Sequence, residues 1–232
     1  MGYSRKEEIA KLRRERREAK ASQRRKENTR DRLVRFLVVC EGTKTEPQYF
    51  EALINNCIST VREVEIKGEG RATVALVKQA LEIKNDLEYK NAMSFDRVWV
   101  VFDKDDFNDF NEAIKEAHRL GFQSAWTNEA FELWYYLHFE YLDTGIGRKA
   151  YIDKIEAFLR KKMGDKHFKY TKGNPEIYRL LQKYGDEALA KRHAQKLRKT
   201  YTGKDYATHK PCTMVDKLVE ELEEPEKLWK NE

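Results

Sequence analysis

The chain has 232 residues, of which 40% are hydrophobic and 37% charged, enough to bury a sizeable core in one large domain or one domain with an appendage. Its basic character is local, because residues 1–32 hold 13 lysines and arginines against 6 acidic residues, while the remainder holds 33 against 34. Three cysteines without a CxxC pair indicate neither a zinc site nor a disulfide framework. No apolar run approaches the roughly 18 residues of a membrane span, and no signal peptide is recognisable, so we expect a cytoplasmic protein.

Residues 1–32 are predicted to form a basic helical or disordered arm, since Glu, Lys, Arg and Ala dominate and almost nothing apolar repeats. An isolated helix of this kind is marginal unless it docks on something. A basic arm on a neutral body favours contact with a polyanion, because each phosphate contact releases counterions. The alternative is a solvated helix that only keeps the protein soluble.

Beyond the arm, short apolar runs alternate with segments of helical periodicity. Residues 33–40 and 97–102 are almost continuously apolar, which is typical of strands covered on both faces. Strands alternating with helices predict βαβ units and a mostly parallel sheet flanked by helices. The predicted strands are residues 33–40, 60–67, 97–102 and 122–126, and the predicted helices between them begin near residue 45 and cover 72–89 and 110–120.

From the fourth predicted strand onward the pattern is helical. An aromatic helix is expected to open at Asn128 and to run to about Phe139. No convincing strand follows Arg148. We therefore predict an α/β core over residues 33–145 and a helical C-terminal extension over 146–232, either packed on the core or forming a small second lobe. The predicted helices of this extension are residues 148–163, 175–184, 186–201 and 213–224.

Acidic residues follow both strong strands, Glu41 after the first and Asp103 and Asp105 after the third. Functional groups of open α/β sheets collect at the carboxyl ends of the strands, and residues two apart on a strand point to the same side. Three carboxylates brought together repel one another unless a cation lies among them. Mg²⁺ suits such a set, with Mn²⁺ as an alternative ion, and the chemistry it serves is phosphoryl transfer.

Each motif alone is weak, because an Asp after a strand often caps a helix and Glu-Gly is often a turn. Their combination is more specific. A hydrophobic strand followed by Glu41-Gly42-Thr43-Lys44-Thr45-Glu46, and later Val-Val-Phe-Asp103-Lys104-Asp105-Asp106, resembles the RloB-like family. The resemblance continues through residues 128–134, His138-Phe139 and residues 211–215.

The RloB-like family is similar to toprim domains, in which a Glu follows the first strand and a DxD pair follows the third. This resemblance implies a toprim-like sheet, with Glu41 as general acid/base and Asp103 and Asp105 as metal ligands. It further implies a nuclease that cuts RNA, with tRNA among the candidates, or DNA. Such proteins resemble the effectors of prokaryotic anti-phage systems, which act in abortive infection beside an ABC- or AAA-type ATPase; a homo-oligomer is also compatible.

Further residues are candidates for supporting the acidic site. Glu46 begins a helix, where it favours the dipole, and is also placed to line the site; Asp106 extends the DxD. Asn128 is either a helix N-cap or a site residue at the carboxyl edge. Glu132, in an apolar helix, must find a partner, so it either faces the metal or pairs with an arginine.

Basic residues near the motifs are candidate contacts to nucleic acid. Lys104, inside the DxD, either contacts phosphate or competes with the metal. Residues 166–172 mix bases with aromatics, as a single-stranded nucleic-acid groove does, and as a surface loop beside a core also does. His138 and Cys40 are expected to be core residues. The candidate contacts are Lys44, Lys104, Lys169, Lys172 and Arg192.

Three other functions compete with a nuclease. The main one is a non-catalytic toprim-like module that binds nucleic acid or an ATPase. A phosphatase with an Asp nucleophile usually has its DxD after the first strand, where Glu41-Gly42 stands here. An ATPase is disfavoured, because the sequence has no GxxxxGK[ST] loop.

Overall fold

The computed structural model describes residues 33–57, 62–70, 73–104 and 108–230. The chain divides into two units, Met1–Leu33 and Val34–Glu232, and the fold is that of the second. The predicted basic arm therefore lies outside the described residues. Within the described residues, no helix is both long enough and apolar enough to cross a membrane.

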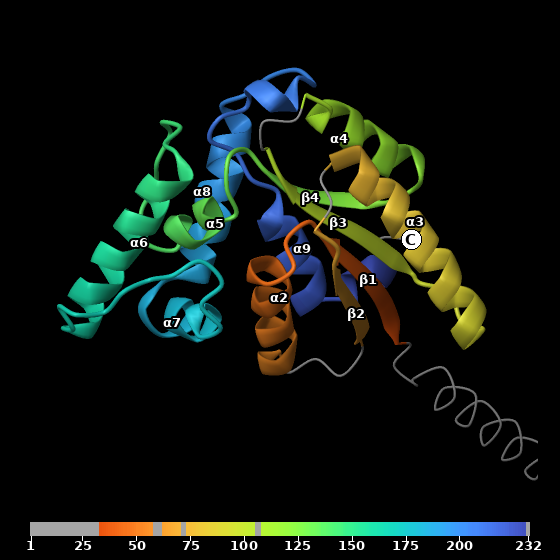
Figure 1. Ribbon diagram of the computed structural model, residues 1–232, viewed down its shortest axis with the longest axis horizontal. Coiled ribbons are helices and arrows are strands. Elements are labelled where there is room, and N and C mark those ends of the chain that lie inside the picture. The colour runs from red at the N-terminus through yellow and green to blue at the C-terminus, as the bar shows by residue number, and fades with distance from the viewer. Residues whose placement is uncertain (1–32, 58–61, 71–72, 105–107, 231–232) are drawn as a thin grey trace, which may run out of the picture. The chain divides into compact units, whose positions relative to one another are not determined.

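A four-stranded, all-parallel sheet forms the centre of the fold, with strand order β2-β1-β3-β4 (Figure 1). Every residue of β1 is buried, as the continuous apolar run predicts for a central strand. The prediction of an α/β fold with a parallel sheet is confirmed. The strands are β1 (Val34–Cys40), β2 (Arg62–Gly68), β3 (Arg97–Asp103) and β4 (Gln123–Thr127).

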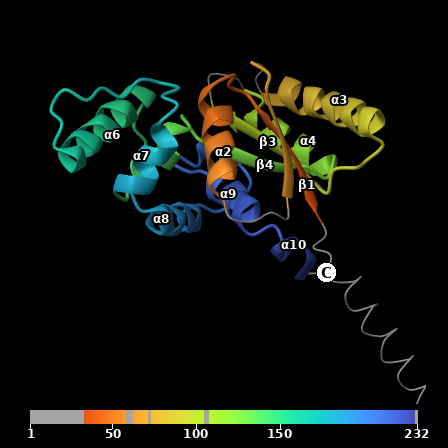
Figure 2. The ribbon, with the colours of Figure 1, turned by 90° about the horizontal axis from the view of Figure 1, so that it is seen from below.

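Helices cover both faces of the sheet, because side chains along each strand alternate between two apolar clusters. Phe36 and Val38 alternate with Leu37 and Val39 in this way along β1. Helices α2 (Thr45–Asn56) and α9 (Val215–Glu223) pack on the first face, and α3 (Thr73–Asn91) and α4 (Phe110–Arg119) on the second (Figures 1 and 2).

The C-terminal part is helical, as predicted. Helices α6 (Arg148–Met163), α7 (Ile177–Tyr184) and α8 (Glu187–Lys199) lie beside α2, on the far side from α3 in both views. Two short elements, η1 (Tyr206–Thr208) and α10 (Lys227–Lys230), were not predicted, because three or four residues carry no periodicity. The remaining described helix is α5 (Glu132–Leu137).

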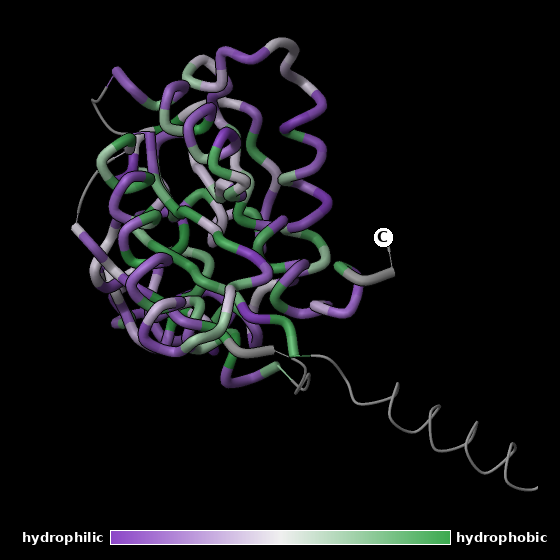
Figure 3. The backbone as a smooth tube through the Cα atoms, turned by 90° about the vertical axis from the view of Figure 1, so that its right-hand side faces the viewer, coloured by the Kyte–Doolittle hydropathy of each residue, from purple (hydrophilic) through white to green (hydrophobic). Residues whose placement is uncertain are grey.

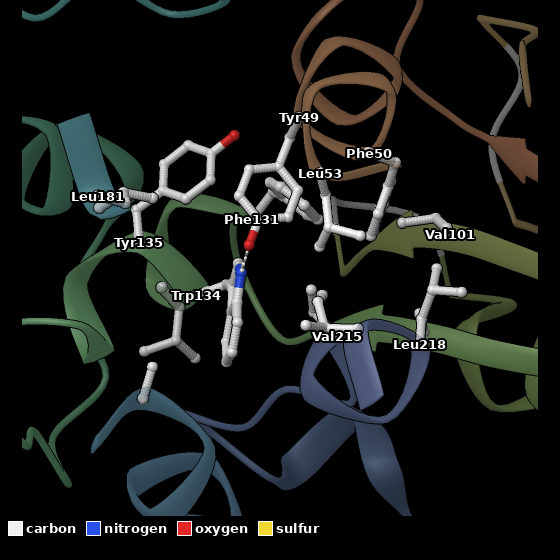
Figure 4. Close-up of a cluster of buried hydrophobic side chains, with 14 of the residues drawn as sticks. Tyr49, Phe50, Leu53, Val101, Phe131, Trp134, Tyr135, Leu181, Val215 and Leu218 are labelled. Carbon is white, nitrogen blue, oxygen red and sulfur yellow. Dashed lines mark hydrogen bonds between the residues drawn. The ribbon is translucent and has the colours of Figure 1, made fainter. Parts of the chain in front are cut away.

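Aromatic residues join α5 to α2 at the centre of the larger cluster (Figure 4). The Trp134 indole N–H donates to the Tyr49 hydroxyl at 2.7 Å, and both side chains are fully buried. His138 is also a core residue, as predicted, and burial lowers its pKa to about 4. The apolar stretches of the chain accordingly gather toward the interior (Figure 3).

The segment before α9 lies along the end of β4 and is fixed by polar contacts. Thr213 forms an antiparallel bridge with Thr127, and the two hydroxyls are 2.9 Å apart. Arg198 of α8 donates to the Thr213 carbonyl at 2.7 Å and to both carboxylate oxygens of Asp216 at 2.5 and 2.6 Å. Since Asp216 is buried, this ion pair ties α8 and α9 to the sheet.

Candidate functional site

Glu41 lies at the carboxyl end of β1, where the strand turns into the loop before α2. Its backbone N–H extends the ladder to the Val101 carbonyl at 2.8 Å, while its own carbonyl accepts from Gly70 N–H at 2.8 Å. The adjacent N–H of Asp103 is bound instead by the Glu41 side chain, whose Oε2 accepts it at 3.1 Å. The two predicted site residues therefore adjoin one another at the same rim of the sheet.

The Asp103 carboxylate is held by two donors. Its Oδ2 accepts from the Phe131 backbone N–H at 3.1 Å and from Arg148 Nη2 at 3.2 Å. Burial raises the pKa of Asp103 well above its usual range, and the nearby carboxylates of Glu46 and Glu132 raise it further; Arg148 and the Phe131 N–H act in the opposite direction. The fold thus holds a carboxylate where its charge is costly.

Two more carboxylates stand behind Asp103, and each has a buried oxygen without a hydrogen-bond partner, Glu46 Oε2 and Glu132 Oε1. Burial and the Glu132 charge raise the pKa of Glu46, against the effects of its own backbone N–H, Lys172 and Arg148. The Glu46 carboxylate can lie against the backbone of residue 42 because that residue is glycine, since an added Cβ there would lie 2.0 Å from Glu46 Oε2. Buried, unsatisfied carboxylate oxygens are costly, so this cluster is suited to a cationic ligand.

A pocket of about 390 Å³ opens beside Glu41 and contains charges of both signs. The Glu41 and Glu46 carboxylates share its lining with two exposed lysines, Lys44 and Lys172. Lys172 comes from the loop between α6 and α7, so the C-terminal part supplies one wall. The lining residues are residues 41–46, Gly70, Lys172 and Gly173.

The carboxylate oxygens at this rim are chemically suited to a hard divalent cation, because Mg²⁺ prefers such ligands. Glu41 and Asp103 supply carboxylates from two adjacent strand ends at this rim. Among the residues that the structure describes, however, no three acidic, histidine or cysteine side chains are grouped as a metal site. The third predicted ligand, Asp105, and also Asp106, fall in residues 105–107, outside the described residues.

A family model for RloB-like proteins matches residues 36–222, which is most of the chain. The chain belongs to the RloB-like family. No curated protein and no solved structure matches it. Membership of the RloB-like family therefore rests on the matched sequence.

The prediction that Asn128 caps a helix is wrong. Its side-chain amide donates to the carbonyls of Tyr206 and Ala207 at 3.3 and 2.9 Å, which fixes the loop after α8. Helix α5 begins at Glu132 rather than at Asn128. The reason is local, since Glu129 has a φ of 88°, a backbone conformation that cannot continue into a right-handed helix.

Of the two expectations for Glu132, the pairing with an arginine is confirmed in the RloB-like chain. It is buried, and its Oε2 lies 3.9 Å from Arg148 Nε. Its charge also acts on Asp103 and Glu46, so it belongs to the acidic cluster. Sequence reasoning missed Arg148 itself. The one available signal was an arginine in the first turn of a helix, where a cation is unfavourable.

The predicted nucleic-acid contacts divide into two groups. Lys44 and Lys172 line the pocket, and half-buried Lys104 follows β3 directly, donating its N–H to the Thr127 carbonyl. Lys169 and Arg192 are exposed but are not part of the pocket lining. Base stacking on residues 166–172 is limited, because Tyr170 is buried in the core.

Proposed function

We propose that this RloB-like protein is a magnesium-dependent nuclease that hydrolyses a phosphodiester at the rim beside Glu41. The observation that carries the proposal is the hydrogen bond between the Glu41 carboxylate and the Asp103 N–H. It brings two acids from adjacent central strands to one edge of the sheet, where such folds place their chemistry. The pocket beside them offers lysines to the phosphates of a nucleic acid.

Each residue has a distinct role in this proposal. Glu41 is half-buried at the pocket, so it exchanges a proton with the attacking water or with the leaving oxygen. Asp103, together with Asp105, holds Mg²⁺ or Mn²⁺, which when bound stabilises negative charge on the reacting phosphate. Lys44 and Lys172 bind neighbouring phosphates and keep the scissile bond beside Glu41.

The biological setting follows from the family resemblance. The substrate class is RNA, including tRNA, or DNA, and the location is the cytoplasm. The protein acts as the effector of an anti-phage system, with an ABC- or AAA-type ATPase as partner that controls it, and with copies of itself as a further partner. The basic arm of residues 1–32 supplies additional charge for a polyanion.

A second candidate function is a non-catalytic module that binds nucleic acid or the ATPase. It is favoured by the Arg148–Asp103 ion pair, which balances part of the cluster charge without a metal. Such a module binds nucleic acid equally well with and without Mg²⁺ and leaves it intact.

Removing the divalent ion separates these two functions. The purified protein, with the proposed partner ATPase, is incubated with total cellular nucleic acid in Mg²⁺, in Mn²⁺ or in EDTA. We expect cleavage products in either metal and none in EDTA, resolved by gel and by sequencing of the new ends. Intact nucleic acid under all three conditions, with binding unchanged by EDTA, contradicts the nuclease and supports the binding module.

Lys172→Ala is expected to weaken nucleic-acid binding several-fold and to lower the salt dependence of the affinity by about one phosphate contact, because Lys172 lines the pocket. Lys169→Ala is the matched control, since Lys169 is exposed on the same loop but does not line the pocket. Fluorescence anisotropy over a range of salt concentrations measures both. Equal losses in the two variants would mean that the pocket is not the binding site.

A further inference from the structure

Arg148 reaches from the first turn of α6 into the acidic cluster. Its Nη2 lies 3.2 Å from Asp103 Oδ2 and its Nε 3.9 Å from Glu132 Oε2. One guanidinium therefore links β3, α5 and α6 at the rim of the sheet. It stands among carboxylates that would otherwise repel one another, which is the place that a bound cation would take.

The position of Arg148 is unfavourable for its own helix. A helix N-terminus carries partial positive charge and disfavours cations, and the first turn of α6 contains no acidic residue to compensate. The Arg148 side chain is still 36% exposed, whereas the Asp103 side chain is only 9% exposed. Arg148 thus covers Asp103 from the solvent side and is the more easily displaced of the two.

We propose that Arg148 is the built-in counter-cation of the acidic cluster and competes with a divalent metal ion for Asp103, so that metal binding releases the first turn of α6. This rests on the proposed function in one respect, namely that the metal binds at Asp103. The consequence is a coupling between metal occupancy and the C-terminal helices. An ion added at the rim loosens α6, and a partner that pulls α6 away from the rim favours the ion.

Mn²⁺ binding, followed by electron paramagnetic resonance of the free ion, tests the competition without any cleavage assay. Arg148→Met is expected to bind Mn²⁺ about ten- to a hundredfold more tightly than wild type, because a close positive charge has been removed. Arg160→Met is the matched control. Arg160 lies on the same helix with the same 36% side-chain exposure and pairs with Glu156. Arg148→Lys, which keeps the charge, is expected to fall between wild type and Arg148→Met.

Hydrogen exchange of the wild-type protein supplies a second readout that needs no variant. The amides of Ala150 and Tyr151 donate to the Gly147 carbonyl in the first turn of α6. Mn²⁺ is expected to accelerate their exchange, whereas a metal that merely rigidifies the site slows it. Unchanged or slower exchange on Mn²⁺ binding overturns the proposal, and so does equal Mn²⁺ affinity of wild type and Arg148→Met, including absence of binding in both.

These results are separable from the fate of the nuclease assignment. Tighter Mn²⁺ binding by Arg148→Met without any cleavage by wild type supports the competition and rejects the nuclease. Metal-dependent cleavage by wild type, with equal Mn²⁺ affinity in wild type and Arg148→Met, supports the nuclease and rejects the competition.

Discussion

Replacing Glu41 with glutamine is expected to reduce metal-dependent cleavage by about 10²- to 10⁴-fold, the usual contribution of a positioned acid or base. The fold should be preserved, because a glutamine oxygen can still accept the hydrogen bond from the Asp103 N–H that Glu41 accepts at 3.1 Å. Only the charge and the exchangeable proton are lost. Single-turnover cleavage and urea unfolding of the same preparations measure the two effects separately. Asp103→Asn is expected to give a loss of activity of the same order.

The control for this prediction lies on the same rim. Glu69 directly follows β2 and is half-buried as Glu41 is, but it does not line the pocket. Glu69→Gln should therefore keep wild-type activity. If Glu41→Gln cleaves as fast as Glu69→Gln, Glu41 is not the proton-transfer group and the proposed mechanism is wrong.

Arg198→Met is expected to lower the free energy of unfolding by about 3–5 kcal/mol, the usual cost of removing one partner of a buried ion pair. Asp216 is 1% exposed and is held by Arg198 through both carboxylate oxygens. Burial already raises the pKa of Asp216, and Arg198 opposes that rise. Without the guanidinium, the carboxylate is left buried and unpaired, and the Thr213 carbonyl loses a donor at the same time.

Urea unfolding at neutral pH measures this loss. Arg179→Met is the comparison, since Arg179 forms an exposed ion pair with Glu176, and such pairs contribute at most about 1 kcal/mol. The double variant Arg198→Met with Asp216→Leu should recover much of the lost stability, because it removes the unpaired charge. If Arg198→Met costs no more than Arg179→Met, then the α8–α9 ion pair does not hold the segment against β4.

The parts of the fold that could be predicted are those whose signal is local. The apolar run 33–40 differs by one residue from β1, and helical periodicity predicted 148–163, the bounds of α6. The start of α5 was predicted wrongly, because the φ of 88° at Glu129 stops a helix from beginning at Asn128, and the Asn128 amide donates instead to carbonyls some eighty residues away. Nothing in the neighbourhood of Asn128 encodes that contact.

In the candidate site, too, some features could be predicted from the sequence and others could not. The meeting of Glu41 and Asp103 could be predicted, because parallel strands end at a common edge. Arg148 could not, since its role depends on a contact between the first turn of α6 and the end of β3, 45 residues apart in the sequence. Tyr170 was placed wrongly for a similar reason. The basic residues around it indicated a surface segment, but its side chain is buried in the core.

The loop that carries Lys172 and Gly173 has a consequence for how the protein is made. Lys172 follows Glu41 by more than a hundred residues, yet both line one pocket. A ribosome therefore releases the β1 strand long before it has translated the pocket's second wall, and α9, which shields one side of the sheet, is synthesised later still. A nascent chain therefore passes through most of its elongation with one wall of the pocket missing, and the pocket is completed only after Lys172 and Gly173 have been translated.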